Sequence, residues 1–335
     1  MNKILTIIVP TYNGGDKLKW SLGTLMPLVK EVEDRVQVLV NDNCSTDNTE
    51  EIVRTLMDQY PGLIDYHRQS KNLGSDPNFF DAAERARTKY ICLMGDDDKV
   101  TPMYFHVIFS VLEKYPNLAY INYNMLVTTY EGMYLGIREK QTVSHYYERG
   151  VDFVLDHMDP PSLMTSNVFL REPFVEAYHS ATELDYPGYN WYYCMLKSIM
   201  HAQCYYIGYP IAMCGEPTGG KEWKKDEAYY AIYGLGHIFK DLSADSPSIY
   251  EAWKKRMFVE NNVKWYIGCV MENKDYYSGE IFQKMLPFID SDHYKRLFSL
   301  ALKNSSRMYL WKTDPVEFLN VCFNKLFSLL RKLNK

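Results

Sequence analysis

Apolar runs and helical segments alternate along the first 125 residues of this chain. The apolar runs, rich in Ile, Val and Leu, cover residues 4–10, 36–42, 63–69, 90–96 and 118–124. The segments between them, residues 15–30, 45–60, 76–90 and 101–115, place apolar side chains at helical spacing. Strands joined through helices usually lie parallel in one sheet. The alternation therefore predicts an α/β fold with a doubly wound, mostly parallel sheet.

The remainder of the chain predicts a different organisation. We expect a helix over residues 150–158, a strand over 166–171, a helix over 190–200, a strand over 204–214, and only helices from residue 226 onward. This predicts an α/β domain over residues 1–215 and a helical C-terminal extension over residues 216–335.

The last segment, residues 315–335, repeats apolar side chains at helical spacing with basic residues among them. An amphipathic helix of this kind lies on a membrane surface, or it packs against preceding helices or a second subunit. The sequence leaves both alternatives open.

Composition argues against several classes of protein. The chain has 37 Lys and Arg against 42 Asp and Glu, and a net charge of -5 argues against a dedicated nucleic-acid-binding protein. The seven cysteines form no C-x-x-C pair, so reduced packing cysteines are expected. No apolar run reaches the roughly 18 to 20 residues of a membrane span, and Pro10 interrupts the first run before a signal peptide can form. We expect a cytoplasmic protein, peripheral on the inner face of the membrane if residues 315–335 bind lipid.

Each of the first four apolar runs ends in a polar cluster. The clusters read "PTYNGG", "NDNCSTDNT", "QSKNLGSD" and "GDDDK". Asn, Asp, Gly and Ser are ordinary turn residues, so one such cluster alone means little. In a parallel sheet, however, the loops after neighbouring strands converge on one edge, where ligands bind. Four clusters in corresponding places predict one shared binding site.

Three adjacent carboxylates, Asp96, Asp97 and Asp98, stand at the end of the fourth run. Like charges this close repel one another unless a cation is present. In an extended segment Asp96 and Asp98 would share one face, about 6.5 to 7 Å apart at their Cα atoms. Carboxylate oxygens suit Mg²⁺ or Mn²⁺, which keep coordination positions for substrate phosphates. A metal site is one interpretation, and a solvated turn or a cap of the following helix is the other.

These motifs together resemble a known family. "IIVPTYNGG", "VNDNCSTDNT", "NLG" and "GDDD", in this order within residues 4–125, resemble the nucleotide-binding half of family 2 glycosyltransferases with the GT-A fold. The resemblance implies that residues 1–125 bind a nucleotide sugar, that residues 126–215 bind the acceptor, and that Mn²⁺ or Mg²⁺ assists an inverting transfer of a single sugar. The implied donor is a UDP- or dTDP-sugar. The implied acceptor is a saccharide or a lipid-linked saccharide of cell-surface polysaccharide assembly.

The resemblance also assigns roles to individual residues. Four of them would surround the base and ribose of the donor: Pro10, Thr11, Tyr12 and Asn13. Tyr12 would offer a stacking face. The Asp42 carboxylate would accept a ring N–H of the base, although an Asx turn before the next helix is an alternative. Asn72 and Gly74 would lie near the diphosphate.

The metal motif aligns with the family in two registers. The literal D-x-D is Asp96 and Asp98, whereas the family's usual pattern aligns Gly95 with its first acid and Asp97 and Asp98 with its last two. Asp98 is common to both registers. It is therefore the first candidate for the metal ligand, with Asp96 and Asp97 beside it.

The acceptor hydroxyl also needs a general base, because its own pKa lies far above 7. In the family this base is commonly an Asp at the start of a helix roughly 90 residues beyond the metal motif, and the matching positions here are Tyr189 and Asn190. The Asn190 amide cannot accept a proton. Asp185 is the first candidate for the catalytic base and Glu183 the second, and a surface-loop or capping role is the alternative for Asp185.

Two other functions stay open at this point. A nucleotidyltransferase that makes the sugar nucleotide would need a Gly-rich, Lys- or Arg-bearing loop near its first strand, which "PTYNGGDK" matches poorly. A non-catalytic protein that binds nucleotide sugars is supported only by Asn190. A dinucleotide oxidoreductase is not expected, because no G-x-G-x-x-G follows the first strand.

Overall fold

The chain divides into two units, residues 1–221 and residues 222–335. The structure is a computed structural model, and it describes residues 3–129, 133–158, 164–181, 185–186, 188–216, 225–260 and 263–303. Glu183 and the predicted helix 315–335 lie outside these residues.

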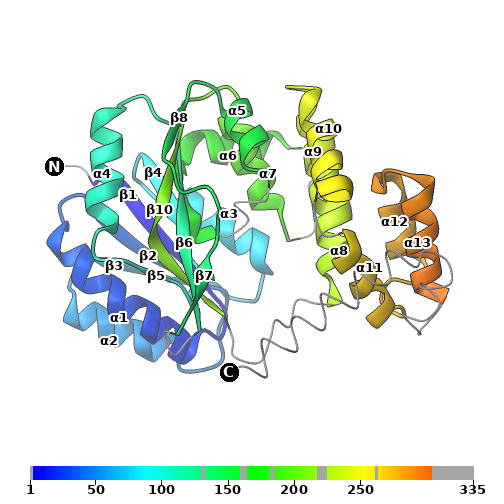
Figure 1. Cartoon of the computed structure of the whole chain (residues 1–335). Helices are drawn as coiled ribbons and strands as arrows, with labels where there is room; N and C mark the ends of the chain where they lie inside the picture. Colours follow the sequence, from blue (N-terminus) through cyan, green and yellow to red (C-terminus); the bar gives the residue numbers. More distant parts are fainter. Residues whose placement is uncertain are drawn as a thin grey trace. The chain divides into compact units, whose positions relative to one another are not determined.

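A ten-stranded sheet forms the centre of the first unit (Figure 1). The strand order is β3-β2-β1-β4-β9-β6-β10-β5, with β7 paired to β6 and β8 paired to β10. The strands are β1 (Leu5–Thr11), β2 (Val36–Asp42), β3 (Ile64–Arg68), β4 (Tyr90–Leu93), β5 (Lys99–Val100), β6 (Tyr120–Thr129), β7 (Tyr134–Ile137), β8 (His145–Tyr147), β9 (Asn167–Leu170) and β10 (Cys204–Glu216).

The first four predicted strands pair in parallel, as their helical connections require. In the β1–β2 ladder Leu5 lies opposite Val36 and Thr11 lies opposite Asp42. β3 extends this sheet beyond β2, and β4 lies on the other side of β1. All seven residues of β1 are buried. Strands covered on both faces need such continuous apolar runs, and the predicted mostly parallel α/β sheet is confirmed.

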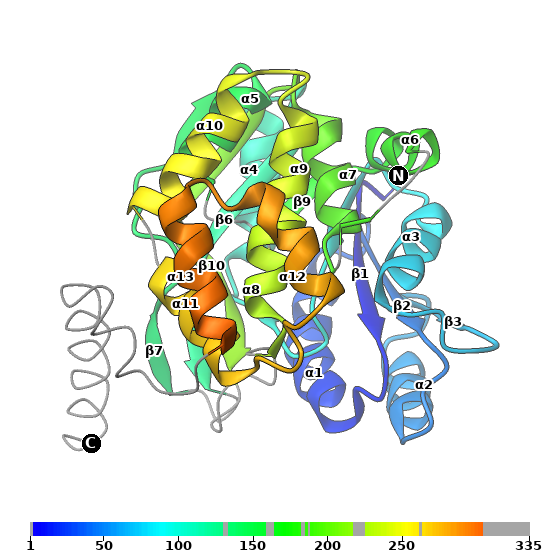
Figure 2. The ribbon, with the colours of Figure 1, turned by 90° about the vertical axis from the view of Figure 1, so that its right-hand side faces the viewer.

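Helices cover both faces of this sheet (Figure 1). One face carries α1 (Gly15–Glu31), α2 (Thr49–Gln59) and α4 (Tyr104–Lys114). The other face carries α3 (Ser75–Arg85), α6 (Arg171–Ser180) and α7 (Asn190–Ile199), and α3 lies beside both α6 and α7 (Figure 2). A shorter helix, α5 (Gly150–Asp156), and a 3-10 turn, η1 (Met164–Ser166), complete the unit.

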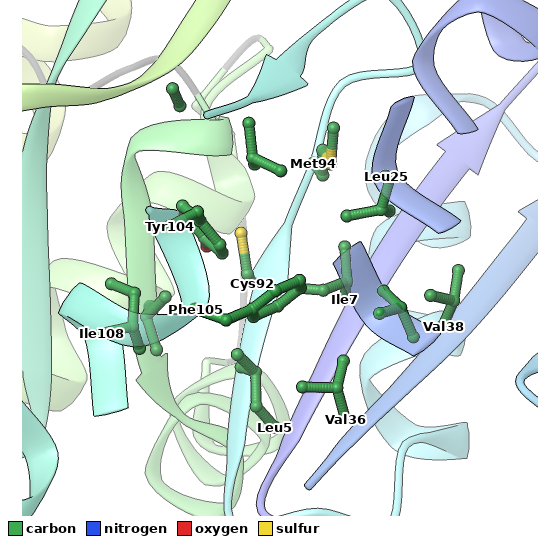
Figure 3. Packing of buried hydrophobic residues seen from close by; sticks show 14 of the residues in the cluster. Leu5, Ile7, Leu25, Val36, Val38, Cys92, Met94, Tyr104, Phe105 and Ile108 are labelled. Atoms are coloured by element: carbon green, nitrogen blue, oxygen red, sulfur yellow. The ribbon is translucent and has the colours of Figure 1, made fainter. Parts of the chain in front are cut away.

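The core between the sheet and its first helical layer is apolar (Figure 3). Leu5 and Ile7 of β1 point into it beside Val36 and Val38 of β2, and Leu25 of α1 packs over them. Every second residue of β1 contributes to this cluster because side chains alternate between the two faces of a strand.

The structure adds features that periodicity did not predict. β9 runs antiparallel to both of its neighbours, β4 and β6. β5, β7 and β8 were not predicted. β5 has two residues and β8 has three, which is too few for a recognisable period, and β7 is mostly exposed and lacks the buried apolar run of β4.

All regular structure in the described residues of the second unit is helical, as predicted. Its elements are α8 (Glu227–Tyr229), the π-helix η3 (Tyr230–Gly234), α9 (Leu235–Leu242), α10 (Ser248–Lys255), the π-helix η4 (Arg256–Glu260), α11 (Val263–Glu272), α12 (Glu280–Met285), the 3-10 turn η5 (Leu286–Phe288) and α13 (Asp292–Lys303). Phe239, Trp253 and Phe258 form part of its buried interior. Among the described helices of the whole chain, none has the length and apolarity needed to cross a membrane.

The buried position of Ile7 gives a test of this core. Ile7 is 0% exposed, whereas Ile137 on β7 is 44% exposed. We expect Ile7→Ala to lower the free energy of unfolding by about 2–5 kcal/mol, because it removes buried methyl groups and leaves a cavity. The same substitution at Ile137 is the control and should cost far less. Equal losses in urea denaturation would contradict the described packing.

Candidate active site

The loops after β1 and β2 are joined by hydrogen bonds. The backbone N–H of Asn13 donates to Ser45 Oγ at 2.9 Å, and the Asn13 side-chain oxygen accepts from the backbone N–H of Thr46 at 2.8 Å. Asn13 has a positive φ of 53° and Cys44 one of 67°. Non-glycine residues in this conformation are uncommon and often stand at binding sites.

Asn43 connects the loop after β3 to the loops after β1 and β2. Its side-chain amide donates to Asn72 Oδ1 at 2.9 Å and to the Gly74 carbonyl at 3.0 Å, and its side-chain oxygen accepts from the Leu73 N–H at 2.8 Å. Asn43 is buried. The sequence did not single it out, because an Asn in a polar loop carries no signal that distinguishes an anchor from a turn residue.

Thr11 connects the fourth loop. Its hydroxyl donates to Asp96 Oδ2 at 2.6 Å. Gly14 lies against this contact: a Cβ at Gly14 would stand 2.2 Å from Thr11 Oγ1 and 2.7 Å from Asp96 Oδ2. Only glycine fits there. The four polar loops therefore meet at one edge of the sheet, as predicted from their positions after the strands.

The three acidic residues lie in a turn and not in an extended segment. The backbone N–H of Asp98 donates to the Gly95 carbonyl at 3.2 Å, which closes the turn. The expected alternation of Asp96 and Asp98 along a strand is therefore wrong, because the chain reverses between β4 and the short strand β5. The alternative of a cap on the following helix is also wrong, since β5 separates the acids from α4.

Asp98 is buried and held from several sides. Its Oδ2 accepts from the Thr165 hydroxyl, and its Oδ1 accepts from the Gly215 N–H at 3.3 Å. The same Thr165 oxygen accepts from the Gly95 N–H at 2.9 Å. Each carboxylate oxygen has a second acceptor position, so these bonds leave Asp98 able to bind a cation. Thr165 was missed because it lies 67 residues away in the chain.

Electrostatics in this turn favour a positive partner. Burial, reinforced by the charge of Asp97, raises the pKa of Asp98 to about 7. Burial also raises the pKa of Asp96, while the Thr11 hydrogen bond acts in the opposite direction. Among the described residues, no three His, Cys, Asp or Glu side chains form a ready-made metal cage. Hard carboxylate oxygens do fit a Mg²⁺ or Mn²⁺ ion that takes its other ligands from a bound phosphate.

The residues expected around a nucleotide differ in exposure. Tyr12 is 48% exposed and Asn13 is also exposed, whereas Pro10 and Thr11 are buried. The aromatic face of Tyr12 is thus available for stacking.

Asp42 is turned into the protein and has 0% exposure. Its Oδ1 accepts from the Ser45 N–H at 2.8 Å, and its Oδ2 accepts from the Tyr66 hydroxyl at 2.7 Å. The Arg68 guanidinium lies 3.7 Å from the same Oδ2. The Asx-type turn is present, and a contact with a nucleotide base would need Tyr66 or Arg68 to move aside.

The predicted base region lies at the start of α7. Asp185 is exposed, and the neighbouring Tyr186 N–H donates to Asn190 Oδ1 at 3.0 Å. The Asn190 amide donates to Asp76 Oδ2 at 2.8 Å. The sequence did not identify Asp76, because "NLGSDP" reads as an ordinary helix start. Asn190 therefore stands between the segment that carries Asp185 and a second carboxylate from α3.

Comparison with known proteins agrees with this geometry. Residues 6–165 match the family described as "Glycosyl transferase family 2". This part of the chain is a family 2 glycosyltransferase domain with the GT-A fold.

Individual relatives of this glycosyltransferase domain are distant. The chain is 34% identical over 95 residues to the abequosyltransferase RfbV of Salmonella typhimurium, which is 28% of each chain. TarS residues 1–349 of S. aureus in complex with UDP-GlcNAc gives a TM-score of 0.58 at 13% identity, covering 93% of this chain and 92% of that chain. A mannosyltransferase of Pyrobaculum calidifontis in complex with GDP-Man and Mn²⁺ gives 0.52 at 14%, covering 98% and 88%. The matched segments cover about a third of the curated relatives, and the structural likeness establishes the fold.

The crowding at Gly14 gives a test of how the glycosyltransferase domain builds its site. We expect Gly14→Ala to destabilise the chain by about 1–3 kcal/mol, because the added methyl group collides with the Thr11–Asp96 hydrogen bond. Gly23→Ala in α1 is the control, since a Cβ there meets nothing within 4 Å and alanine favours a helix by about 1 kcal/mol. Thermal unfolding measures both, and a Gly14→Ala variant as stable as Gly23→Ala would exclude the close approach.

Proposed function

We propose that this chain transfers a single sugar from a nucleotide-diphosphate donor to a saccharide or lipid-linked saccharide acceptor in cell-surface polysaccharide assembly. The favoured donor is a UDP- or dTDP-sugar. The UDP-GlcNAc complex of TarS, which shares the fold, and the abequosyltransferase among the relatives support this class of reaction.

One observation carries the proposal. Four loops converge where β1, β2, β3 and β4 end, and hydrogen bonds of Asn13, Asn43 and Thr11 join them around an acidic turn. Exposed Tyr12 stands on the first of these loops. A stacking face and carboxylates at one sheet edge suit a base and a metal-bound diphosphate.

A divalent metal is part of this proposal. Asp98 would hold Mn²⁺ or Mg²⁺ together with Asp96 and Asp97, and Asn72 and Gly74 would lie on the diphosphate side. The ion would supply Lewis-acid stabilisation of the charge on the leaving diphosphate. Asp42 would accept a hydrogen bond from the nucleotide base after Tyr66 or Arg68 moves aside. Pro10 and Thr11 would support the loop that carries Tyr12 and Asn13.

The reaction itself needs a base and an acceptor hydroxyl. The base removes the hydroxyl proton, the oxygen bonds to the anomeric carbon of the donor sugar, and the bond from that carbon to the diphosphate breaks, with inversion. Asp185 is the candidate base from the sequence, and Glu183 is the second.

A donor screen tests the proposal. UDP-GlcNAc, UDP-glucose, UDP-galactose and dTDP-glucose would each be incubated with the full chain and Mn²⁺, and release of nucleoside diphosphate would be measured. Release from at least one sugar supports a transferase, because such enzymes hydrolyse their donors slowly. Binding of a nucleotide sugar without any release would favour the non-catalytic alternative that Asn190 raised. If none of these nucleotide sugars binds and none releases its nucleotide, the proposal is rejected.

The metal assignment can be tested at Asp98. Removing a residue that only hydrogen-bonds to a metal ligand costs about 10- to 100-fold in metal affinity. Asp98 is proposed as a ligand itself, so Asp98→Asn should weaken Mn²⁺-dependent UDP binding by at least about tenfold. Asp65→Asn, an exposed carboxylate on β3, is the matched control and should leave binding unchanged. Calorimetry with UDP, with and without Mn²⁺, measures both. An unaltered metal dependence in Asp98→Asn would remove this residue from the metal site.

The base assignment can be tested at Asp185. If Asp185 is the general base, Asp185→Asn should lower turnover at least about a hundredfold, in line with usual general-base contributions. Donor binding should persist, because the substitution keeps the side-chain shape. Unchanged turnover would exclude Asp185 from the mechanism.

A further inference from the structure

Asp76 lies at the same sheet edge as the four loops. It stands in the first turn of α3, two residues after Gly74. The loop that leads into it, Asn72 to Gly74, is anchored by the side chain of Asn43, next to the end of β2. The carboxylate of Asp76 is therefore placed by the same hydrogen bonds that assemble the proposed donor site.

Asn190 fixes one oxygen of this carboxylate and leaves the other without a donor. The Asn190 amide donates to Asp76 Oδ2 at 2.8 Å, and Asn190 Oδ1 accepts from the Tyr186 N–H, so the orientation of the amide is set from both ends. Asp76 Oδ1 is buried and accepts no hydrogen bond from the described part of the chain. Buried carboxylate oxygens normally accept a hydrogen bond, and Asp76 Oδ1 is an exception. A ligand hydroxyl can supply the hydrogen bond that is missing there.

The surroundings adjust the proton affinity of this group. Burial raises the pKa of Asp76 to about 6, while the Asn190 side chain and the backbone N–H groups of Trp191 and Asn190 act in the opposite direction. On α7, burial and the charge of Asp76 raise the pKa of the Cys194 thiol to about 12, so this neighbour stays neutral. A carboxylate of this kind is ionised at pH 7 but binds a proton more readily than an ordinary surface Asp, as general-base catalysis requires.

We propose that Asp76, oriented by Asn190, is the group that accepts the proton of the acceptor hydroxyl, at its buried and unpaired Oδ1. The hydroxyl donates to Oδ1, its oxygen forms the bond to the anomeric carbon, and the electron pair of the broken bond leaves with the diphosphate. The start of α7, where the family commonly has the catalytic Asp, thus carries the amide of Asn190, and the carboxylate beside it is Asp76 from α3. This inference rests on the proposed function.

Asp76 and Asp185 are alternative candidates for the general base, and they differ in exposure. Asp185 is exposed on the segment before α7, whereas Asp76 is half-buried and its Oδ1 lies below the surface. Asp76 also has a purely structural alternative, which is to stabilise the start of α7 through its hydrogen bond to Asn190. The experiment therefore measures the rate of nucleotide release and, separately, thermal unfolding and UDP binding.

The test compares Asp76→Asn, Asp185→Asn and Glu84→Gln in the full chain at saturating Mn²⁺. Glu84 is a carboxylate on the same helix that pairs with His179 at the surface, and its substitution is the matched control. The probe is whichever of UDP-GlcNAc, UDP-glucose, UDP-galactose and dTDP-glucose the unaltered chain hydrolyses fastest. Asp76→Asn should lower nucleotide release at least about a hundredfold, with UDP binding and thermal unfolding close to those of the unaltered chain. Release within about threefold of the unaltered rate would overturn the proposal.

The pH dependence of release gives a second reading that a structural role would not move. Activity of the unaltered chain should fall as pH drops through about 6, because the base becomes protonated. Asn190→Ala removes a hydrogen bond that favours the ionised carboxylate, so the acid limb should move to higher pH. An unmoved limb would overturn the role of Asp76. If the unaltered chain releases no nucleotide from any sugar, the proposed function itself fails, which separates the two outcomes.

Discussion

Burial of both faces of the parallel strands determines where the polar groups of this chain can stand. The seven residues of β1 are all buried, and its ladders with β2 and β4 satisfy its backbone groups. A polar side chain inside such a layer needs a protein partner, as Thr6 finds in Thr88 at 2.7 Å. Polar groups meant for a ligand therefore collect beyond the strand ends. The glycosyltransferase domain places its four loops there because the core leaves no other location for them.

At that edge the loops are fixed by side chains that bond to the backbone of another loop. Asn43 makes two such bonds and a third to the side chain of Asn72, and Thr165 satisfies both a backbone N–H and a buried carboxylate. Networks of this kind are rigid when each member has a partner. Three acids at this edge carry raised pKa values, Asp96, Asp98 and Asp76, and all three stand where the proposed chemistry needs a negative charge. A folded chain tolerates such desolvated charges where function uses them.

Periodicity predicted the long elements well, and contacts between distant residues account for what it missed. The strands β1, β2, β3, β4, β6, β9 and β10 and the helices between them lie in apolar runs that can be recognised in the sequence. β5 and β8 are too short for this and β7 is mostly exposed, and all three exist because a neighbouring strand offers an edge to pair with. The acidic run was expected to be extended, but its turn depends on the Gly95–Asp98 bond and on Thr165, which no local pattern reveals.

The sequence by itself determined the parallel α/β sheet, the order of its loops and the presence of an acidic cluster after the fourth strand, because these follow from spacing between residues near one another in the chain. Only the tertiary structure decided which side chains meet: Asp42 is enclosed by Ser45 and Tyr66, and Asn190 bonds to Asp76 from 114 residues away. The physical reason is that hydrogen bonds and burial act through space. A loop residue acquires its chemical environment only when the sheet has brought its partners to the same edge.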